Sequence, residues 1–166
     1  MKNIFVTVGT TEFDSLLNAV TSTKVLDHFV EKGYTHLTLQ KGRGQFELSK
    51  ENHKCLKIEC FDYKDSIAGD MNEASLVISH AGAGSILETL SLWKPLIVVV
   101  NEELMDNHQF ELASKMADEG YLFYCTCASL LETLQTKDLT QLKHKQPVDE
   151  KVFGNFLNEF VGIVSS

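Results

Sequence analysis

Cysteine, proline and long apolar runs are scarce in this sequence, and each scarcity excludes a class of protein. The 166 residues include four cysteines and two prolines. The cysteines lack the paired C-x-x-C spacing of a structural zinc site and are too few to staple a domain of this length. No stretch offers the roughly 20 apolar residues that a helix needs to cross a bilayer. We therefore expect reduced thiols and no transmembrane helix.

The sequence also lacks an excess of positive charge and the features of a signal peptide. Its formal net charge of −8 disfavours nucleic acid as a partner. The first apolar run, Ile4 to Val8, is short and is ended by Gly9, unlike the apolar region of a secretory signal. We expect a cytosolic protein that can still bind a small anion at a few backbone amides.

Short β-rich runs alternate with segments of helical periodicity along the whole chain, without a repeat or a linker. The predicted strands are residues 4–8, 35–40, 55–60, 75–79, 95–100 and 121–124. The predicted helices are residues 12–32 in two pieces, 65–72, 86–92, 106–119 and 149–164. This alternation predicts one α/β domain over residues 1–166, with a mostly parallel, Rossmann-like sheet flanked by helices. We place the most apolar strand, 95–100, at the centre of the sheet.

The last predicted helix, residues 149–164, carries an apolar stripe that is wider than one packing face usually requires. The stripe includes Phe153, Phe156, Phe160 and Val164. Two interpretations remain open: the stripe packs entirely on the protein's own sheet, or part of it contacts a partner.

Two glycine-containing turns follow predicted strands, where open parallel sheets bind their ligands. The first turn, Gly9-Thr10-Thr11, offers close backbone approach and two hydroxyls. It fits a phosphate contact, and it fits a plain tight turn.

The second turn places Gly82 and Gly84 at the start of a predicted helix, where the helix dipole and free amides favour an anion. It is not the dinucleotide fingerprint, because the bulky Leu87 stands at the third glycine position. A nicotinamide dehydrogenase is therefore disfavoured.

Side chains beside the second turn also have alternative interpretations. Glu88 lies three residues beyond Ser85 on nearly the same helix face. It can accept hydrogen bonds from a ribose diol, or it can form a capping box with Ser85. His80 can donate to a phosphate oxygen or be purely structural. A metal site at His80 and His108 lacks a third ligand at a recognised spacing.

The segment Asp106 to Gln109 opens the next predicted helix. Its short polar side chains suit sugar hydroxyls, and Asp106 or Asn107 also suits N-capping. Covalent hydrolysis is not indicated, because there is no G-x-S-x-G motif and no base beside the cysteines.

Residues 79–88, with Lys94-Pro95 and residues 106–109 after them, carry a family resemblance. They resemble the donor-binding C-terminal half of B-type glycosyltransferases that use UDP-sugars, of the family 28 C-terminal-domain type. Nearly the whole chain is similar to the donor-binding subunits of one group of these transferases. The similarity is carried by residues 5–11, 39–44, 63–66 and 77–127. These transferases add the second N-acetylglucosamine to the dolichol-linked precursor of asparagine-linked glycans.

This resemblance implies an inverting transfer of N-acetylglucosamine from UDP-N-acetylglucosamine to the 4-hydroxyl of N-acetylglucosaminyl-diphosphodolichol, with a β-1,4 linkage. Such folds usually stabilise the leaving diphosphate with amides and helix dipoles, so we predict no cofactor. The implied donor-binding residues are Gly9, Thr10, Thr11, Phe61, His80, Gly82, Gly84, Ser85, Glu88, Asn107, His108 and Gln109.

Within this set the resemblance implies separate roles. The glycines, Thr10, Ser85 and His80 would hold the diphosphate. Glu88 would bind the ribose, Phe61 would border the uracil, and residues 107–109 would face the sugar. Gly84 stands where plant-type relatives have asparagine, so one side-chain contact is absent.

The resemblance also implies a second protein. Two-domain relatives carry acceptor binding, and usually the general base, on an N-terminal half that a chain of 166 residues cannot contain. A membrane-anchored subunit would supply that half and hold the chain at the cytosolic face of the endoplasmic reticulum. Two other functions remain open: a UDP-sugar-binding module without catalysis, and a subunit of a bacterial exopolysaccharide transferase.

Overall fold

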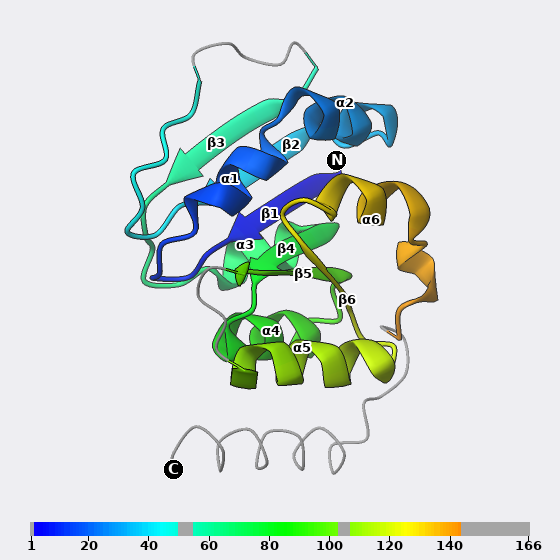
Figure 1. Ribbon diagram of the computed structural model, residues 1–166. Coiled ribbons are helices and arrows are strands. Elements are labelled where there is room, and N and C mark those ends of the chain that lie inside the picture. The colour runs from blue at the N-terminus through cyan, green and yellow to red at the C-terminus, as the bar shows by residue number, and fades with distance from the viewer. Residues whose placement is uncertain (1, 50–54, 103–106, 144–166) are drawn as a thin grey trace.

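The computed structural model describes residues 2–49, 55–102 and 107–143 (Figure 1), and the side chains of residues 107–109 are not described. The predicted helix at residues 149–164 lies outside the described part of the chain. None of the described helices is long and apolar enough to cross a membrane.

Six parallel strands form one sheet in the order β3-β2-β1-β4-β5-β6. The strands are β1 (Asn3–Thr7), β2 (His36–Gln40), β3 (Lys57–Phe61), β4 (Leu76–His80), β5 (Leu96–Val100) and β6 (Phe123–Thr126). The chain first adds strands on one side of β1 and then, from β4 onward, on the other side. The boundary between β1 and β4 is therefore the topological switch point, beyond which open α/β sheets bind ligands.

Helices cover both faces of this sheet (Figure 1). One face packs against α1 (Asp14–Val20), α2 (Thr23–Glu31) and α6 (Leu130–Thr136). The other packs against α3 (Ala68–Glu73), α4 (Ala83–Ser91) and α5 (Asn107–Asp118). A short 3-10 helix, η2 (Leu139–Gln141), follows α6. The predicted α/β class and the mostly parallel sheet are confirmed.

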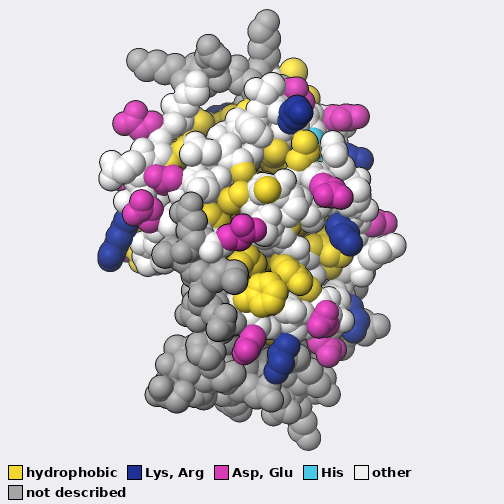
Figure 2. All heavy atoms as spheres, viewed as in Figure 1, with side chains coloured by type: hydrophobic (Ala, Val, Ile, Leu, Met, Phe, Trp, Pro, Cys, Tyr) yellow, Lys and Arg dark blue, Asp and Glu magenta, His cyan; other side chains and the backbone are white. Residues whose placement is uncertain are grey.

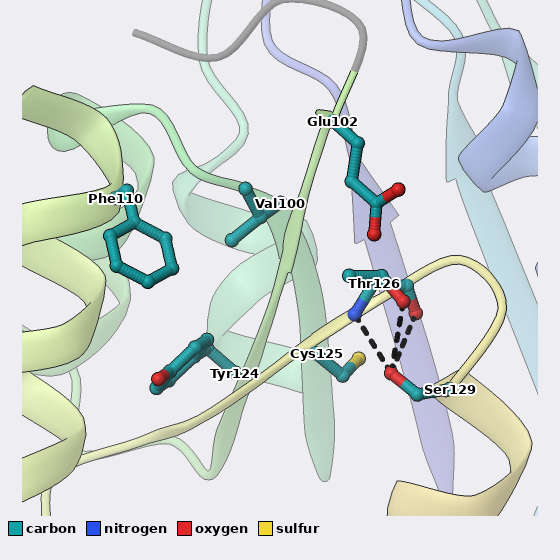
Figure 3. Close-up of a pocket in the computed structure, with 7 residues that line it drawn as sticks. All are labelled: Val100, Glu102, Phe110, Tyr124, Cys125, Thr126 and Ser129. Atoms are coloured by element: carbon teal, nitrogen blue, oxygen red, sulfur yellow. Dashed lines mark hydrogen bonds between the residues drawn. The ribbon is translucent and has the colours of Figure 1, made fainter. Parts of the chain in front are cut away.

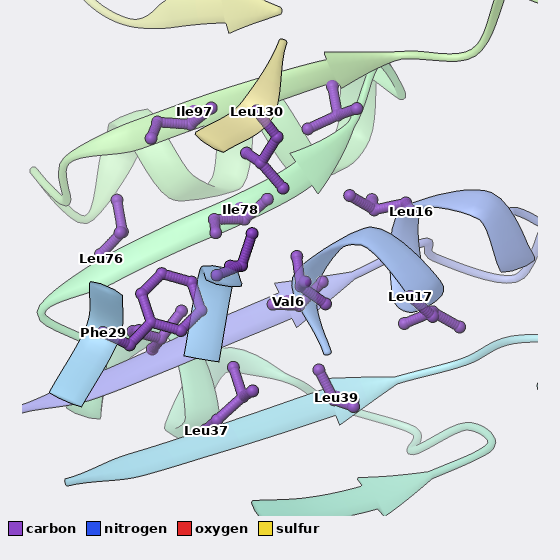
Figure 4. Packing of buried hydrophobic residues seen from close by; sticks show 14 of the residues in the cluster. Val6, Leu16, Leu17, Phe29, Leu37, Leu39, Leu76, Ile78, Ile97 and Leu130 are labelled. Carbon is purple, nitrogen blue, oxygen red and sulfur yellow. The ribbon is translucent and has the colours of Figure 1, made fainter. Parts of the chain in front are cut away.

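The strands supply two hydrophobic cores because successive side chains point to opposite faces. In β5, Ile97 and Val99 belong to the core beneath α1, α2 and α6, which Figure 4 shows. Leu96, Val98 and Val100 belong to the core beneath α4 and α5. Both faces of β5 are covered, as predicted. Its predicted central place is wrong, because β1 and β4 occupy the centre and β5 lies beside β4.

Two elements between residues 130 and 141, α6 and η2, have no counterpart in the prediction from sequence. With seven residues, α6 is too short for its periodicity to stand out. Leu130 and Thr133 nevertheless bury one face of it, and α6 completes the layer formed by α1 and α2.

Candidate functional site

The turn after β1 lies at the switch point and is closed by its own hydrogen bonds. Gly9 has φ +63°, in the left-handed region that favours glycine. Both the N–H and the hydroxyl of Thr11 donate to the carbonyl of Val8, at 3.2 and 2.7 Å. The turn is therefore fixed before any ligand arrives.

One amide of this turn is used internally and another is not. The N–H of Gly9 donates to the hydroxyl of Thr7 at 2.9 Å. The N–H of Thr10 donates to no described residue, and Thr10 is exposed. The amide of Gly9 is therefore used within the turn, whereas the amide of Thr10 has no acceptor among the described residues.

The turn after β4 leads into α4, whose N-terminus has no side-chain cap. Gly82 is the N-cap residue and α4 begins at Ala83. The N–H groups of the first helical turn have no intrahelical acceptor, and the helix dipole adds partial positive charge there. A Cβ atom added to Gly84 would meet no atom within 4 Å, so the space beside these amides is open. The capping-box interpretation of Ser85 and Glu88 is wrong, because Ser85 is the third residue of the helix.

His80, the last residue of β4, fills the room that the two turns leave between them. A Cβ atom on Gly9 would lie 3.0 Å from Cε1 of the ring, and one on Gly82 would overlap Nε2. Burial lowers the pKa of His80, and an interaction with the backbone of Thr7 partly opposes this effect. The buried Nδ1 of the ring has no hydrogen-bond partner of normal geometry among the described residues. The imidazole is therefore neutral at pH 7 and can donate one hydrogen bond.

The turn after β2 supports the turn after β1, a role that the sequence does not indicate. Gly42 has φ +62° and donates to the carbonyl of Asp62 at 3.0 Å. The N–H of Arg43 donates to the carbonyl of Thr11 at 3.1 Å. A Cβ atom on Gly42 would overlap that same carbonyl. Only glycine at this position therefore allows the turn after β2 to pack so closely against the turn after β1.

Phe61 ends β3, on the far side of β2 from the switch point. Its ring stacks on Phe5 with centroids 6.4 Å apart and planes 12° apart. The ammonium of Lys64 lies 4.2 Å from the Phe61 centroid and pairs with Asp70 at 3.2 Å. The ring is thus held in place at the same edge of the sheet as both turns.

The remaining predicted residues lie in the middle of α4 and at the start of α5. Glu88 is partly buried on α4, one turn beyond Ser85. Asn107, His108 and Gln109 are the first three residues of α5, which follows β5. The backbone therefore brings the predicted residues to the carboxyl edge of the sheet.

A cavity of about 710 Å³ lies at the ends of β5 and β6 and is lined by none of the residues of these turns (Figure 3). Phe110 and Tyr124 pack edge to face at its mouth, with centroids 5.7 Å apart, and Glu102 points into it. Figure 2 shows exposed hydrophobic side chains in the region of α5 and β6. The sequence does not indicate this cavity, because its lining comes from segments that are far apart in the chain.

A parallel sheet with a switch point, glycine turns beyond it and an uncapped helix N-terminus place this chain among the open α/β domains, a class that commonly binds phosphate-containing ligands at this edge. Residues 3–162 match the model of the glycosyltransferase family 28 C-terminal domain. The chain belongs to this family, which confirms the family resemblance.

Relatives of known name are similar over most of this chain. The UDP-N-acetylglucosamine transferase subunit ALG13 of Mus musculus is 52% identical over 130 residues, covering 78% of this chain and 11% of the relative. The human subunit is 48% identical over 145 residues, covering 87% and 13%. The chain thus spans a small part of these two relatives. The NMR solution structure of ALG13 superposes with a TM-score of 0.71 at 30% identity, covering 94% of each chain.

Proposed function

We propose that this chain is the donor-binding subunit of a two-component glycosyltransferase. It transfers N-acetylglucosamine from UDP-N-acetylglucosamine to N-acetylglucosaminyl-diphosphodolichol with inversion, forming a β-1,4 linkage. This is the second step in assembling the dolichol-linked oligosaccharide for protein N-glycosylation. The names of the relatives, which describe a UDP-N-acetylglucosamine transferase subunit, support the donor and the need for a partner.

The observation that carries this proposal is the pair of turns at the switch point. The N–H of Thr10 has no acceptor among the described residues, and the first amides of α4 have no intrahelical acceptor. These amides would bind the two phosphates, whose charge the dipole of α4 favours. Neutral His80 donates a further hydrogen bond. These groups are positioned before the reaction and stabilise the leaving diphosphate without a metal.

The other parts of the donor follow from the same placement. Glu88, one turn further along α4, binds the ribose hydroxyls. Phe61 borders the uracil at the end of β3. The start of α5, with Asn107, His108 and Gln109, faces the sugar.

The acceptor site and the general base belong to a membrane-anchored partner. The acceptor's polyprenyl chain lies in the bilayer, so the partner holds this chain at the cytosolic face of the endoplasmic reticulum. A base on the partner then deprotonates the attacking 4-hydroxyl while this chain holds UDP.

A transfer assay tests the proposal. Labelled N-acetylglucosamine is supplied as its UDP donor with N-acetylglucosaminyl-diphosphodolichol, with and without microsomal membranes that carry the candidate anchor. We expect product only when chain and membranes are combined, and none with Gly82→Val in place of the wild-type chain. Tight donor binding without transfer would instead identify a non-catalytic module. Transfer only to an undecaprenyl-linked acceptor would identify an exopolysaccharide enzyme.

A further inference from the structure

A row of three buried polar side chains lies directly beneath the two turns. Gln40, Thr7 and Ser79 stand side by side on β2, β1 and β4, because Thr7 pairs in register with both of the others. Their exposed fractions are 1%, 0% and 0%. The residue before each one belongs to the core beneath α1, α2 and α6. By alternation, the three side chains point to the face that α4 covers.

Thr7 connects this row to the first turn. Its hydroxyl donates to Oε1 of Gln40 and accepts the N–H of Gly9 at 2.9 Å. The backbone carbonyl of Gln40 also accepts the N–H of Val8, at 3.3 Å. Both partners of the hydroxyl are therefore fixed, and Gly9 is held in its left-handed conformation from below.

Ser79 connects the row to the second turn. Its hydroxyl donates to the carbonyl of His80 at 2.8 Å, immediately before the turn that carries Gly82. The row thus hydrogen-bonds one backbone group beside each turn: the N–H of Gly9 and the carbonyl of His80.

Stability alone does not account for the pairing of the Thr7 hydroxyl with the Gln40 side chain. Valine has the shape of threonine, and replacing both partners of a buried hydrogen bond by apolar groups of similar shape is often nearly neutral. The neighbouring positions on the same face of the sheet, Phe5 and Val77, are apolar and buried. On β1 and β4 the change from apolar to polar side chains on this face therefore comes where the strands approach the turns, whereas on β2 the preceding position on this face is the partly buried Thr38.

We propose that Gln40, Thr7 and Ser79 are positioning residues for the donor's diphosphate. Thr7 withdraws the Gly9 amide from the surface of the turn, which leaves the N–H of Thr10 directed at the ligand. Ser79 fixes the backbone that carries His80 and Gly82. This inference rests on the proposed function, because it assigns the row to the diphosphate part of that site.

Three variants of the 166-residue chain test the row: Thr7→Val, Thr7→Ser and the double variant Thr7→Val/Gln40→Leu. Binding of UDP and of uridine is measured by calorimetry or ligand-observed NMR, and unfolding by circular dichroism. Thr38→Val is the matched control, because Thr38 is a threonine on the same face of β2, away from the turns.

We expect Thr7→Val to weaken UDP binding about tenfold, the effect of one lost hydrogen bond, while uridine binding is unchanged. Thr7→Ser should restore UDP binding. The double variant should regain the part of the stability that Thr7→Val loses by leaving Gln40 unpaired, but not the UDP affinity, because the Gly9 amide still lacks its acceptor. The amide of Gly9 should exchange faster with solvent in both valine variants. If Thr7→Val does not fold, the double variant carries the test.

Two results would overturn this inference while the proposed function stands: a parallel loss of UDP and uridine affinity, or recovery of UDP affinity together with stability in the double variant. Failure of the wild-type chain to bind UDP would instead refute the proposed function, and this inference with it.

Discussion

Adding one methyl group at Gly82 should damage both the stability of the protein and its site. Gly82 has φ −86° and ψ 129°, a conformation that any residue adopts, so Gly82→Ala introduces no backbone strain. The methyl group would, however, overlap Nε2 of His80 and lie 2.7 Å from its Cε1. The whole effect therefore arises from one contact.

The size of the effect follows from how little room the ring has to move. The backbone of Gly9 also lies close to the imidazole, since a Cβ atom built on it would lie 3.0 Å from Cε1, and this turn limits how far the ring can move toward it. Overpacking of this kind costs about 1–3 kcal/mol, and the lower entropy of the unfolded alanine chain returns about 0.4–1 kcal/mol. We expect a net loss of about 1 kcal/mol in the free energy of unfolding.

Donor affinity should fall as well, because relief of the overlap displaces either His80 or the first turn of α4. Both groups face the proposed diphosphate. A loss of about 1.4 kcal/mol in binding corresponds to tenfold weaker UDP binding. Urea denaturation and calorimetric titration with UDP measure the two effects.

Gly84→Ala is the matched control for stability. Position 84 is the second residue of α4, and its added methyl group meets nothing within 4 Å. Alanine should stabilise this helical position by up to about 1 kcal/mol. In a His80→Ala background the penalty of Gly82→Ala should disappear, since its cause is removed. Equal stability of Gly82→Ala and Gly84→Ala would refute the reasoning.

Three further predictions concern other parts of the chain. Trp93 follows the C-cap of α4 with φ 62°, a position that favours glycine, so Trp93→Gly should raise the free energy of unfolding by about 1 kcal/mol in urea denaturation; a decrease would show that the packing of the ring outweighs the strain. Glu88→Ala should weaken UDP binding by about 1–3 kcal/mol and leave 2′,3′-dideoxy-UDP unaffected; equal losses for both ligands would exclude a ribose contact. Burial raises the pKa of Cys125 to about 12, so alkylation of the folded protein at pH 8 should spare Cys125 and modify the exposed Cys55; early modification of Cys125 would contradict its burial.

Local features of the fold could be predicted from the sequence. A continuous apolar run identified β5 as covered on both faces, and glycine after β1 indicated a tight turn there, although not its left-handed conformation. Strand order was not predictable in the same way, because the sequence pattern of β5 is the same whether β1 and β4 or β4 and β6 flank it. The position of β5 beside β4 depends on the face of the sheet on which the connecting helix α4 packs.

In the candidate site, too, local features could be predicted from the sequence and contacts between distant segments could not. Glycines and polar residues after strands marked its edge, because parallel strands end on one side of a sheet. The contact of His80 with both glycines was not predictable, since it joins turns that are distant in sequence. The Thr7 and Gln40 pair left a weaker signal: each is a buried polar residue at the end of its strand and directly follows a buried apolar residue.

The titration of His80 should affect stability and donor binding in opposite directions. Its pKa is lowered by burial in the folded protein, whereas the unfolded chain takes up the proton near pH 6.5. Between these values the unfolded state binds more protons, so stability is complete above about pH 6.5 and decreases as the pH falls below it. The difference in unfolding free energy between wild type and His80→Gln should therefore shrink from pH 7 to pH 5. The titration of the carboxylates does not contribute to this difference, because both proteins contain the same ones. Protonated His80 beside a diphosphate is favourable, so affinity for UDP-N-acetylglucosamine should rise over the same range in wild type alone. Parallel stability curves for the two proteins would show that the ring is not buried as described, and a pH-independent affinity would place the diphosphate away from it.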